Sequence, residues 1–269
     1  MIRTVGLPTV SIPRHIDFPK PPPLDLQPHL KLYVGVIRQI LEVLMATSAQ
    51  LEEWAKAVVN ASPDLDADDR RIIVATYRLL AGGEAVSEAE IAEETALTVE
   101  RVEASLRAWP LVLRDEDDRV IGFWGMHAHY VKPTHAITHD NATIYGWCAL
   151  DTLFIPEIID REVRVESEDP TSGAKVRLVV TPKGIGDLDP PGAVVSFLLP
   201  DNGDRFADDA IARFCHQIYF FESARSAEAW IADRTDRFFL TVEDAFELGK
   251  RMNRLRLGAI SESAGDRAS

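Results

Sequence analysis

Cysteine is scarce in this sequence. Only two occur among 269 residues, Cys148 and Cys215. A chain of this length buries a large apolar core and needs no disulfide for stability, so the pair does not indicate a disulfide-rich secreted domain. We expect the two thiols to be either buried bystanders, because free cysteine packs like a small apolar side chain, or reactive groups.

Positive charge and long apolar runs are also in short supply. The chain has 29 basic and 43 acidic side chains and a formal net charge of -14. Such a chain repels phosphate backbones and anionic lipids, so we expect neither nucleic acid nor a membrane as a partner. The N-terminal segment has no signal-peptide core, and no later segment reaches the roughly 18 apolar residues of a membrane span. The sequence therefore predicts a cytoplasmic protein.

The sequence divides into four stretches. Residues 1–30 hold seven of the sixteen prolines and predict an extended arm. Residues 31–128 predict a helical winged-helix-like domain, and residues 129–259 an α+β domain that carries the candidate site. Residues 260–269 predict a flexible tail. The fold class is α+β, with a helical N-terminal region followed by a mostly antiparallel sheet flanked by helices.

The winged-helix prediction rests on the order of the elements. Apolar residues at helical spacing predict helices over residues 30–61 and 66–80. Ser87 and Glu90 match a capping box for a short helix, and Thr98 starts another. The sequence LVLRDEDDRVIGFWG then predicts two short strands around an acidic turn. Helices, a turn and a hairpin in this order are typical of a winged helix-turn-helix.

The charge of this region argues against DNA binding. Seven glutamates and a single arginine, Arg101, lie between residues 84 and 103. A recognition helix must offset phosphate repulsion with Lys and Arg, and this one adds to the repulsion. We interpret the region as a structural or lid domain. A winged-helix transcription factor is the alternative, and it predicts a salt-dependent shift of DNA in a gel.

The second half of the chain alternates between strand and helix patterns. The sequences REVRVESE and KVRLVVTP alternate apolar and polar residues around the turn DPTSGA and predict a hairpin, and AVVSFLLP predicts a buried strand. RFCHQIYFF also alternates and predicts a strand, with Cys215 and His216 on opposite faces. Helices are predicted over SARSAEAWIADR and over TVEDAFELGKRMNRLRLG, where Thr241 and Asp244 are the cap and its partner and Gly258 is the stop.

A thiol and a carboxylate lie three residues apart in YGWCALDTL. In a helix, Cys148 and Asp151 would share one face. Pro156 must end or kink that helix, which keeps Cys148 near its start, where the helix dipole favours the thiolate. A buried carboxylate is costly without a partner, and no Lys or Arg lies between residues 143 and 160. We predict that Asp151 either faces a cavity or holds a proton.

Histidines and glycines add no second site. Four histidines lie close together, but their spacing matches no zinc-ligand pair with a cysteine, and we interpret them as a loop of solvated side chains. They are His127, His129, His135 and His139. The sequence shows neither a nucleophile elbow around a serine nor a phosphate-binding glycine loop.

These segments together resemble the organomercurial (alkylmercury) lyases. The resemblance covers residues 86–257 and rests on YGWCALDTLFIPEII, the paired strands, VVSFLLP, RFCHQIYFF, SAEAWIADR and TVEDAFELGKRMNR. The family's two catalytic cysteines fall on Cys148 and Cys215, and its catalytic aspartate falls on Asp151. His216 stands where many members have a further cysteine, and the N-terminal stretch is longer than is usual in the family. The family also has an acidic winged-helix-like region that does not bind DNA.

The resemblance implies an enzyme of mercury detoxification that cleaves the carbon–mercury bond by protonolysis, giving a hydrocarbon and Hg(II). Cys148, Cys215 and Asp151 would hold the mercury, because thiolate is the soft ligand that a soft metal prefers. Asp151 would take a proton from a cysteine and give it to the leaving carbon. Because an ordinary aspartate is ionised at neutral pH, either an apolar setting raises the pKa of Asp151 or a thiol supplies the proton.

No cofactor is implied by the resemblance, since mercury is both substrate and product. The implied partners are the organomercurial and, as acceptors of Hg(II), small thiols or a mercuric reductase. The alternative is a relative that binds a soft metal without catalysis, as a sensor or scavenger.

Overall fold

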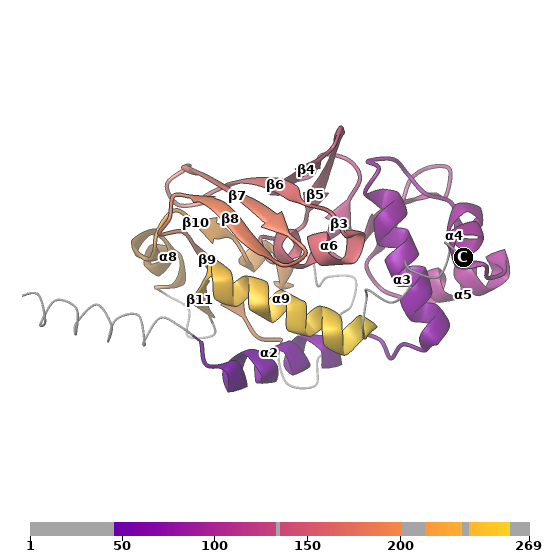
Figure 1. Cartoon of the computed structure of the whole chain (residues 1–269), viewed down its shortest axis with the longest axis horizontal. Coiled ribbons are helices and arrows are strands. Elements are labelled where there is room, and N and C mark those ends of the chain that lie inside the picture. The colour runs from indigo at the N-terminus through magenta and orange to yellow at the C-terminus, as the bar shows by residue number, and fades with distance from the viewer. Residues whose placement is uncertain (1–45, 133–134, 201–212, 233–236, 259–269) are drawn as a thin grey trace, which may run out of the picture. The chain divides into compact units, whose positions relative to one another are not determined.

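The computed structural model describes residues 46–132, 135–200, 213–232 and 237–258 (Figure 1). The predicted arm over residues 1–30, the first part of the helix predicted over 30–61, and the tail over 260–269 lie outside these residues. The helices are α2 (Ser48–Asn60), α3 (Ala67–Leu80), α4 (Glu88–Thr95), α5 (Val99–Ala108), α6 (Asp151–Ile159), α8 (Ala224–Ile231) and α9 (Val242–Leu257). A short 3-10 helix, η1, spans Cys215–Gln217. In this part of the chain, no helix is both long enough and apolar enough to span a membrane.

Each of the first four helices begins at a capping residue, and the predicted caps of α4 and α5, Ser87 and Thr98, are confirmed. Asp66 caps α3 and Ser87 caps α4, each through a complete capping box, and Thr98 caps α5 by accepting the amide hydrogen of Arg101. The chain leaves α4 through Ala96, whose φ of 52° is left-handed. The predicted helix-turn-helix is therefore confirmed as α4 and α5, packed beside α3.

An eight-stranded antiparallel sheet comes after these helices in the chain. Its strands are β1 (Val112–Arg114), β2 (Val120–Phe123), β3 (Met126–His127), β4 (His135–His139), β5 (Ala142–Gly146), β6 (Val163–Glu168), β7 (Lys175–Thr181) and β8 (Gly184–Asp189), in the order β1-β2-β3-β5-β4-β6-β7-β8. The predicted hairpins are β1–β2 and β6–β7. Because β3 pairs with both β2 and β5, the wing and the second half of the chain share one sheet. The domain boundary at residue 128 stays a prediction.

The interpretation of the histidines as a solvated loop is wrong. His127 belongs to β3 and is 8% exposed, and His135 belongs to β4 and is 1% exposed. A neutral imidazole is buried at low cost when it is hydrogen-bonded, and His135 Nδ1 lies 2.8 Å from Ser167 Oγ. His139 is partly buried with Nε2 2.9 Å from the Ala81 carbonyl, and His129 is the one that is exposed. Burial lowers the pKa of His135 to about 3.

A second sheet has three strands, in the order β10-β9-β11, and packs beside the eight-stranded sheet. Its strands are β9 (Val194–Leu198), β10 (Phe220–Phe221) and β11 (Arg237–Thr241). Every residue of β9 is buried, as predicted for AVVSFLLP. Helix α9 begins after its cap, Thr241, and ends before Gly258, as predicted. In Figure 1, α9 runs between α2 and the strands.

The prediction of a strand over RFCHQIYFF is wrong for most of its length. Cys215 lies in η1, where the Gln217 amide donates to the Phe214 carbonyl and the Ile218 amide to the Cys215 carbonyl, both at 3.0 Å. These local bonds replace the ladder of a strand, and only Phe220 and Phe221 pair with β9. The alternation of aromatic residues reflects packing around a tight turn, which carries Cys215 into the interior.

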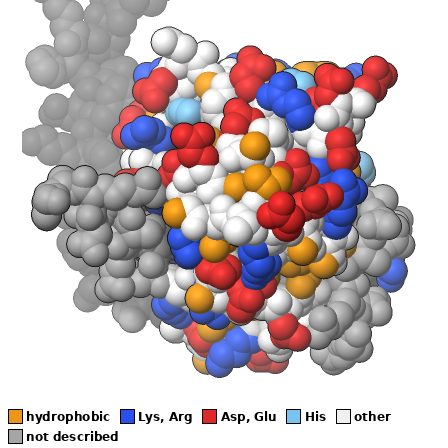
Figure 2. All heavy atoms as spheres, turned by 90° about the vertical axis from the view of Figure 1, so that its right-hand side faces the viewer, with side chains coloured by type: hydrophobic (Ala, Val, Ile, Leu, Met, Phe, Trp, Pro, Cys, Tyr) orange, Lys and Arg blue, Asp and Glu red, His pale blue; other side chains and the backbone are white. Residues whose placement is uncertain are grey.

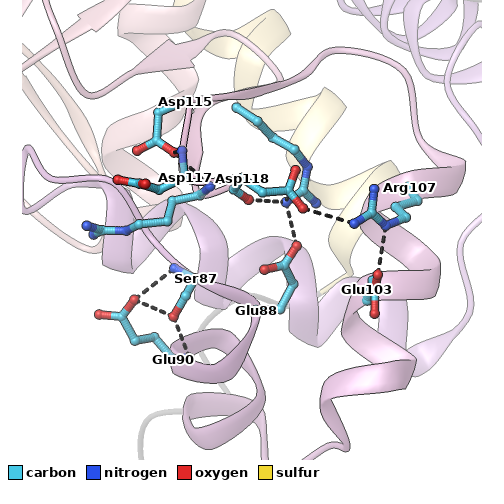
Figure 3. Close-up of polar contacts among 10 residues, drawn as sticks. Ser87, Glu88, Glu90, Glu103, Arg107, Asp115, Asp117 and Asp118 are labelled. Carbon is cyan, nitrogen blue, oxygen red and sulfur yellow. Dashed lines mark hydrogen bonds and ion pairs between the residues drawn. The ribbon is translucent and has the colours of Figure 1, made fainter.

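Arginines of the helix-turn-helix and the wing form ion pairs with acidic side chains of the same region. Arg107 pairs with Glu103 at 2.8 Å and with Asp118 at 2.9 Å, and Arg114 pairs with Glu88 (Figure 3). Figure 2 looks onto the side that lies to the right in Figure 1 and shows acidic side chains interleaved with basic ones. These ion pairs tie α4 and α5 to the wing and leave less positive charge for a phosphate backbone, in agreement with a structural role.

Candidate active site

Cys148, Asp151 and Cys215 converge. One ligand atom from each residue lies within 4.8 Å of the other two, and all three side chains are buried. In the described part of the chain, they are the one group of three Cys, His, Asp or Glu residues with this geometry. A gap of more than 60 positions thus separates side chains that meet at a single point.

The turn that holds Cys148 connects β5 to α6. Cys148 precedes the helix, which begins at Asp151, and Asp151 Oδ2 accepts the backbone amide hydrogen of Cys148 at 2.8 Å. The expectation that both lie on one helical face is therefore wrong, and a turn closed by the carboxylate brings them together instead. Pro156 does not end the helix, which runs on to Ile159.

The wing supplies the surface against which Asp151 packs. Between β2 and β3 the chain passes through Trp124 and Gly125 with φ values of 39° and 102°. A Cβ on Gly125 would lie 2.3 Å from Asp151 Oδ1, so only glycine fits. The Gly125 carbonyl accepts the Trp147 amide hydrogen at 2.9 Å, and the Tyr77 hydroxyl donates to the Trp124 carbonyl at 2.6 Å. The helix-turn-helix region therefore builds one wall of the site.

The second cysteine is held by contacts between the two turns. The Ala149 amide donates to the Ile218 carbonyl at 3.0 Å, which joins the turn of Cys148 to the turn that follows Cys215. Phe214 packs edge-on against Phe197 of β9, with ring centroids 6.1 Å apart. These contacts fix the distance between the sulfurs through the backbone on both sides.

The three groups line a largely apolar pocket with an empty volume of about 590 Å³ that includes open solvent at its mouth. Apolar residues from α2, α6, α9 and the loops form most of its wall. They include Val58, Pro63, Leu111, Trp147, Phe154 and Met252. Among the described residues that line the pocket, one is a cation, Arg256 of α9. The pocket thus suits an organic group rather than a polar ligand.

Burial sets the protonation of the site. It raises the pKa of Asp151 to about 7, against the opposing effects of hydrogen bonds from Cys148 and the charge of Arg256. This direction agrees with the first of the two alternatives given for Asp151, an apolar setting that raises its proton affinity. Burial, the hydrogen bond with Cys215 and the charge of Asp151 raise the pKa of the Cys148 thiol, so the expected stabilisation of the thiolate by the helix dipole does not dominate.

Sequence analysis missed two residues of the site, Arg256 and Tyr77. Arg256 lies four residues after Met252 on the buried face of α9, so helical periodicity could have identified it as a cation on an apolar stripe. Burial raises the pKa of Tyr77, whose hydroxyl is hydrogen-bonded at the back of the Trp124 turn. Nothing in the spacing of Tyr77 pointed to the site.

The arrangement can bind a soft metal and move a proton. Two sulfurs at this separation can both ligate one ion, since thiolate ligands lie about 2.3 Å from zinc and soft metals prefer sulfur. A carboxyl group whose pKa lies near neutrality can accept a proton from a thiol and donate it to a reacting atom in the same pocket.

Comparisons with known proteins find similarity to one family. The family described as "Alkylmercury lyase" matches residues 131–254, and "Helix-turn-helix domain of alkylmercury lyase" matches residues 50–124. The alkylmercury lyase of Bacillus cereus is 38% identical over 65% of this chain and 77% of its own length. The alkylmercury lyase of Staphylococcus epidermidis is 37% identical over 70% of this chain and 82% of its own length. The solved structure of the mercury-bound form of MerB2 is similar in fold, with a TM-score of 0.61 and 19% identity over 78% of this chain and all of that one.

Proposed function

The chain belongs to the alkylmercury lyase family and is an enzyme that cleaves carbon–mercury bonds, and we propose that Cys148, Cys215 and Asp151 perform this reaction. The observation that carries the proposal is the convergence of the two sulfurs and the carboxylate within 4.8 Å in an apolar pocket. The overall reaction is protonolysis to a hydrocarbon and Hg(II), the chemistry of mercury detoxification.

Capture of the substrate begins with sulfur. One cysteine thiol replaces the ligand that accompanies the organomercurial, forming a sulfur–mercury bond and releasing a proton, because a thiol that coordinates a metal is deprotonated. That first proton leaves with the displaced ligand. The Asp151 carboxylate accepts the proton of the second thiol as it approaches the metal, which its pKa of about 7 allows at neutral pH. The geometry leaves open which cysteine attacks first.

Cleavage follows when the second sulfur also binds mercury. A second thiolate raises the electron density on the metal and weakens its bond to carbon. The carbon–mercury bond breaks with its electron pair remaining on carbon, and the proton held by Asp151 forms the new carbon–hydrogen bond. Mercury stays in the divalent state on the two thiolates, so no oxidant or reductant is required.

The apolar pocket supports both steps. It accommodates the organic group and keeps the three reacting groups buried, which strengthens electrostatic interactions between them. It also raises the proton affinity of Asp151, since a buried carboxylate is less stable than a buried carboxylic acid. We further propose that small thiols or a mercuric reductase remove Hg(II) by thiol exchange, and that the enzyme acts in the reducing cytoplasm, where both cysteines stay free.

The test measures benzene released from phenylmercury in the presence of excess thiol. We expect product from the wild type and none above background from Cys148→Ser, Cys215→Ser or Asp151→Asn. Asp160→Asn is the matched control, because Asp160 is exposed at the far end of the same helix. Phenylmercury that binds to the wild type but remains intact would favour the sensor or scavenger and refute the enzyme mechanism.

A further inference from the structure

We propose that Arg256 is a specificity-determining residue that recognises a carboxylate on the organic group of the substrate. The inference rests on the proposed function and extends it by naming a substrate class, organomercurials with an anionic organic group. It is carried by the position of Arg256, a buried cation with one unpaired hydrogen-bond donor, in the wall of a largely apolar pocket.

The guanidinium of Arg256 is fixed in place. Its side chain is 9% exposed, Nη2 donates to Ser62 Oγ at 3.1 Å, and its central carbon lies 5.4 Å from the ring centroid of Trp124. On the preceding turn of α9, Asn253 Nδ2 donates to the Phe154 carbonyl at 3.0 Å. The helix that carries Arg256 is thereby anchored to α6, the helix that begins at Asp151.

One donor of this guanidinium is unused. The Nε atom is buried and has no hydrogen-bond partner among the described residues. Among the described residues Arg256 forms no ion pair, and Asp151 acts on it through its charge alone, without a hydrogen bond. A buried donor without a partner costs free energy, and a ligand that supplies an acceptor recovers it.

The chemistry of arginine and of the pocket selects the ligand. A planar guanidinium matches a carboxylate better than it matches any neutral group, and a charge-assisted hydrogen bond in a dry site is strong. The apolar wall would hold the hydrocarbon part of such a substrate while mercury lies at the sulfurs. An aryl or alkyl group with a carboxylate at its far end would contact the apolar wall and bind the Arg256 guanidinium at the same time.

The first experiment uses the wild type. KM and kcat are measured for 4-mercuribenzoate and for its methyl ester, which has the same aryl core and no charge. We expect KM to be lower for the acid by at least about tenfold, the equivalent of one hydrogen bond to a charged group. Equal KM values would overturn the inference.

The second experiment uses variants. In Arg256→Met, which retains the packing on Trp124, we expect the loss of kcat/KM for 4-mercuribenzoate to exceed the loss for phenylmercury by at least about tenfold. Arg254→Met is the control, because Arg254 lies on the same helix, is 61% exposed and pairs with Glu52. Equal losses for both substrates would refute specificity, and the ester comparison still decides the question if Arg256→Met does not fold.

A third arm separates two sources of the carboxylate. Phenylmercury is supplied with mercaptoacetate or with 2-mercaptoethanol, so that the charge lies on the accompanying thiol instead of the organic group. A preference of the wild type for the mercaptoacetate adduct, lost in Arg256→Met, would overturn the assignment to the organic group. Benzene release from phenylmercury reports on the proposed function by itself, so failure of that reaction and failure of this inference are distinguishable.

Discussion

Replacing the carboxylate of Asp151 should stabilise the fold while abolishing activity. Asp151 is 5% exposed and its pKa is raised from 3.8 to about 7. Three pKa units correspond to about 4 kcal/mol, so ionising this group above pH 7 costs the folded protein about that much relative to the unfolded chain. Asparagine removes the charge and retains an oxygen that can accept the Cys148 amide hydrogen.

The sign of the pH dependence follows from the direction of the shift. Between about pH 4 and pH 7 the unfolded chain loses the proton of Asp151 while the folded protein keeps it, so wild-type stability falls through this window. The free-energy advantage of Asp151→Asn over the wild type should therefore grow by about 3 kcal/mol between pH 5 and pH 8. The side-chain amide of the new asparagine adds hydrogen-bond donors without acceptors. This cost lowers the net gain in the free energy of unfolding at pH 8 to about 2–3 kcal/mol.

Urea unfolding of both proteins at pH 5 and pH 8 measures this difference. The lowered pKa of His135 destabilises both proteins as the pH falls below about 6.5, and this contribution cancels in the comparison. Asp160→Asn, an exposed substitution at the end of the same helix, is the control. A difference between Asp151→Asn and the wild type that is independent of pH, or a variant that is less stable at pH 8, would refute the reasoning.

Three further predictions follow from the site and the helix-turn-helix. The kcat/KM for phenylmercury should rise with pH through about 7, because the Asp151 carboxylate must be free to accept a thiol proton; a flat profile between pH 5.5 and 8.5 would exclude this role. Gly125→Ala should cost at least about 2 kcal/mol in urea unfolding and reduce activity, whereas Gly173→Ala, with a φ of 76° and open space around it, should cost about 1 kcal/mol and leave activity intact. The protein should not retard duplex DNA at about 0.1 M salt, and a salt-dependent shift would contradict the structural role of α4 and α5.

The local elements were predictable because their signals are local. The capping boxes at Asp66 and Ser87, the hairpin of β6 and β7, and the boundaries of α9 each depend on residues within a few positions of one another. Charge counting argued against a DNA-binding surface from composition alone, without any geometry. The family resemblance named the three groups of the site without their arrangement.

Longer-range packing overrode the local patterns in two places. RFCHQIYFF has the alternating pattern of a strand. The short helix η1 buries Phe214 and Phe220 on either side of a turn as well as a strand would. The histidines are polar by composition and were expected in solvent, yet His135 is buried and shares a hydrogen bond with Ser167 of the neighbouring strand. Neither neighbour can be identified from a single stretch of sequence.

The sequence by itself determined that a thiol and an acid lie side by side in an apolar run, with a second thiol elsewhere. Only the tertiary structure decided that Cys215 meets them, that Gly125 from the wing packs on the carboxylate, and that Arg256 lines the same pocket. The physical reason is that residue types and spacing encode local chemistry and conformation. The pKa of Asp151, by contrast, depends on burial by segments that are up to about a hundred residues away in the chain.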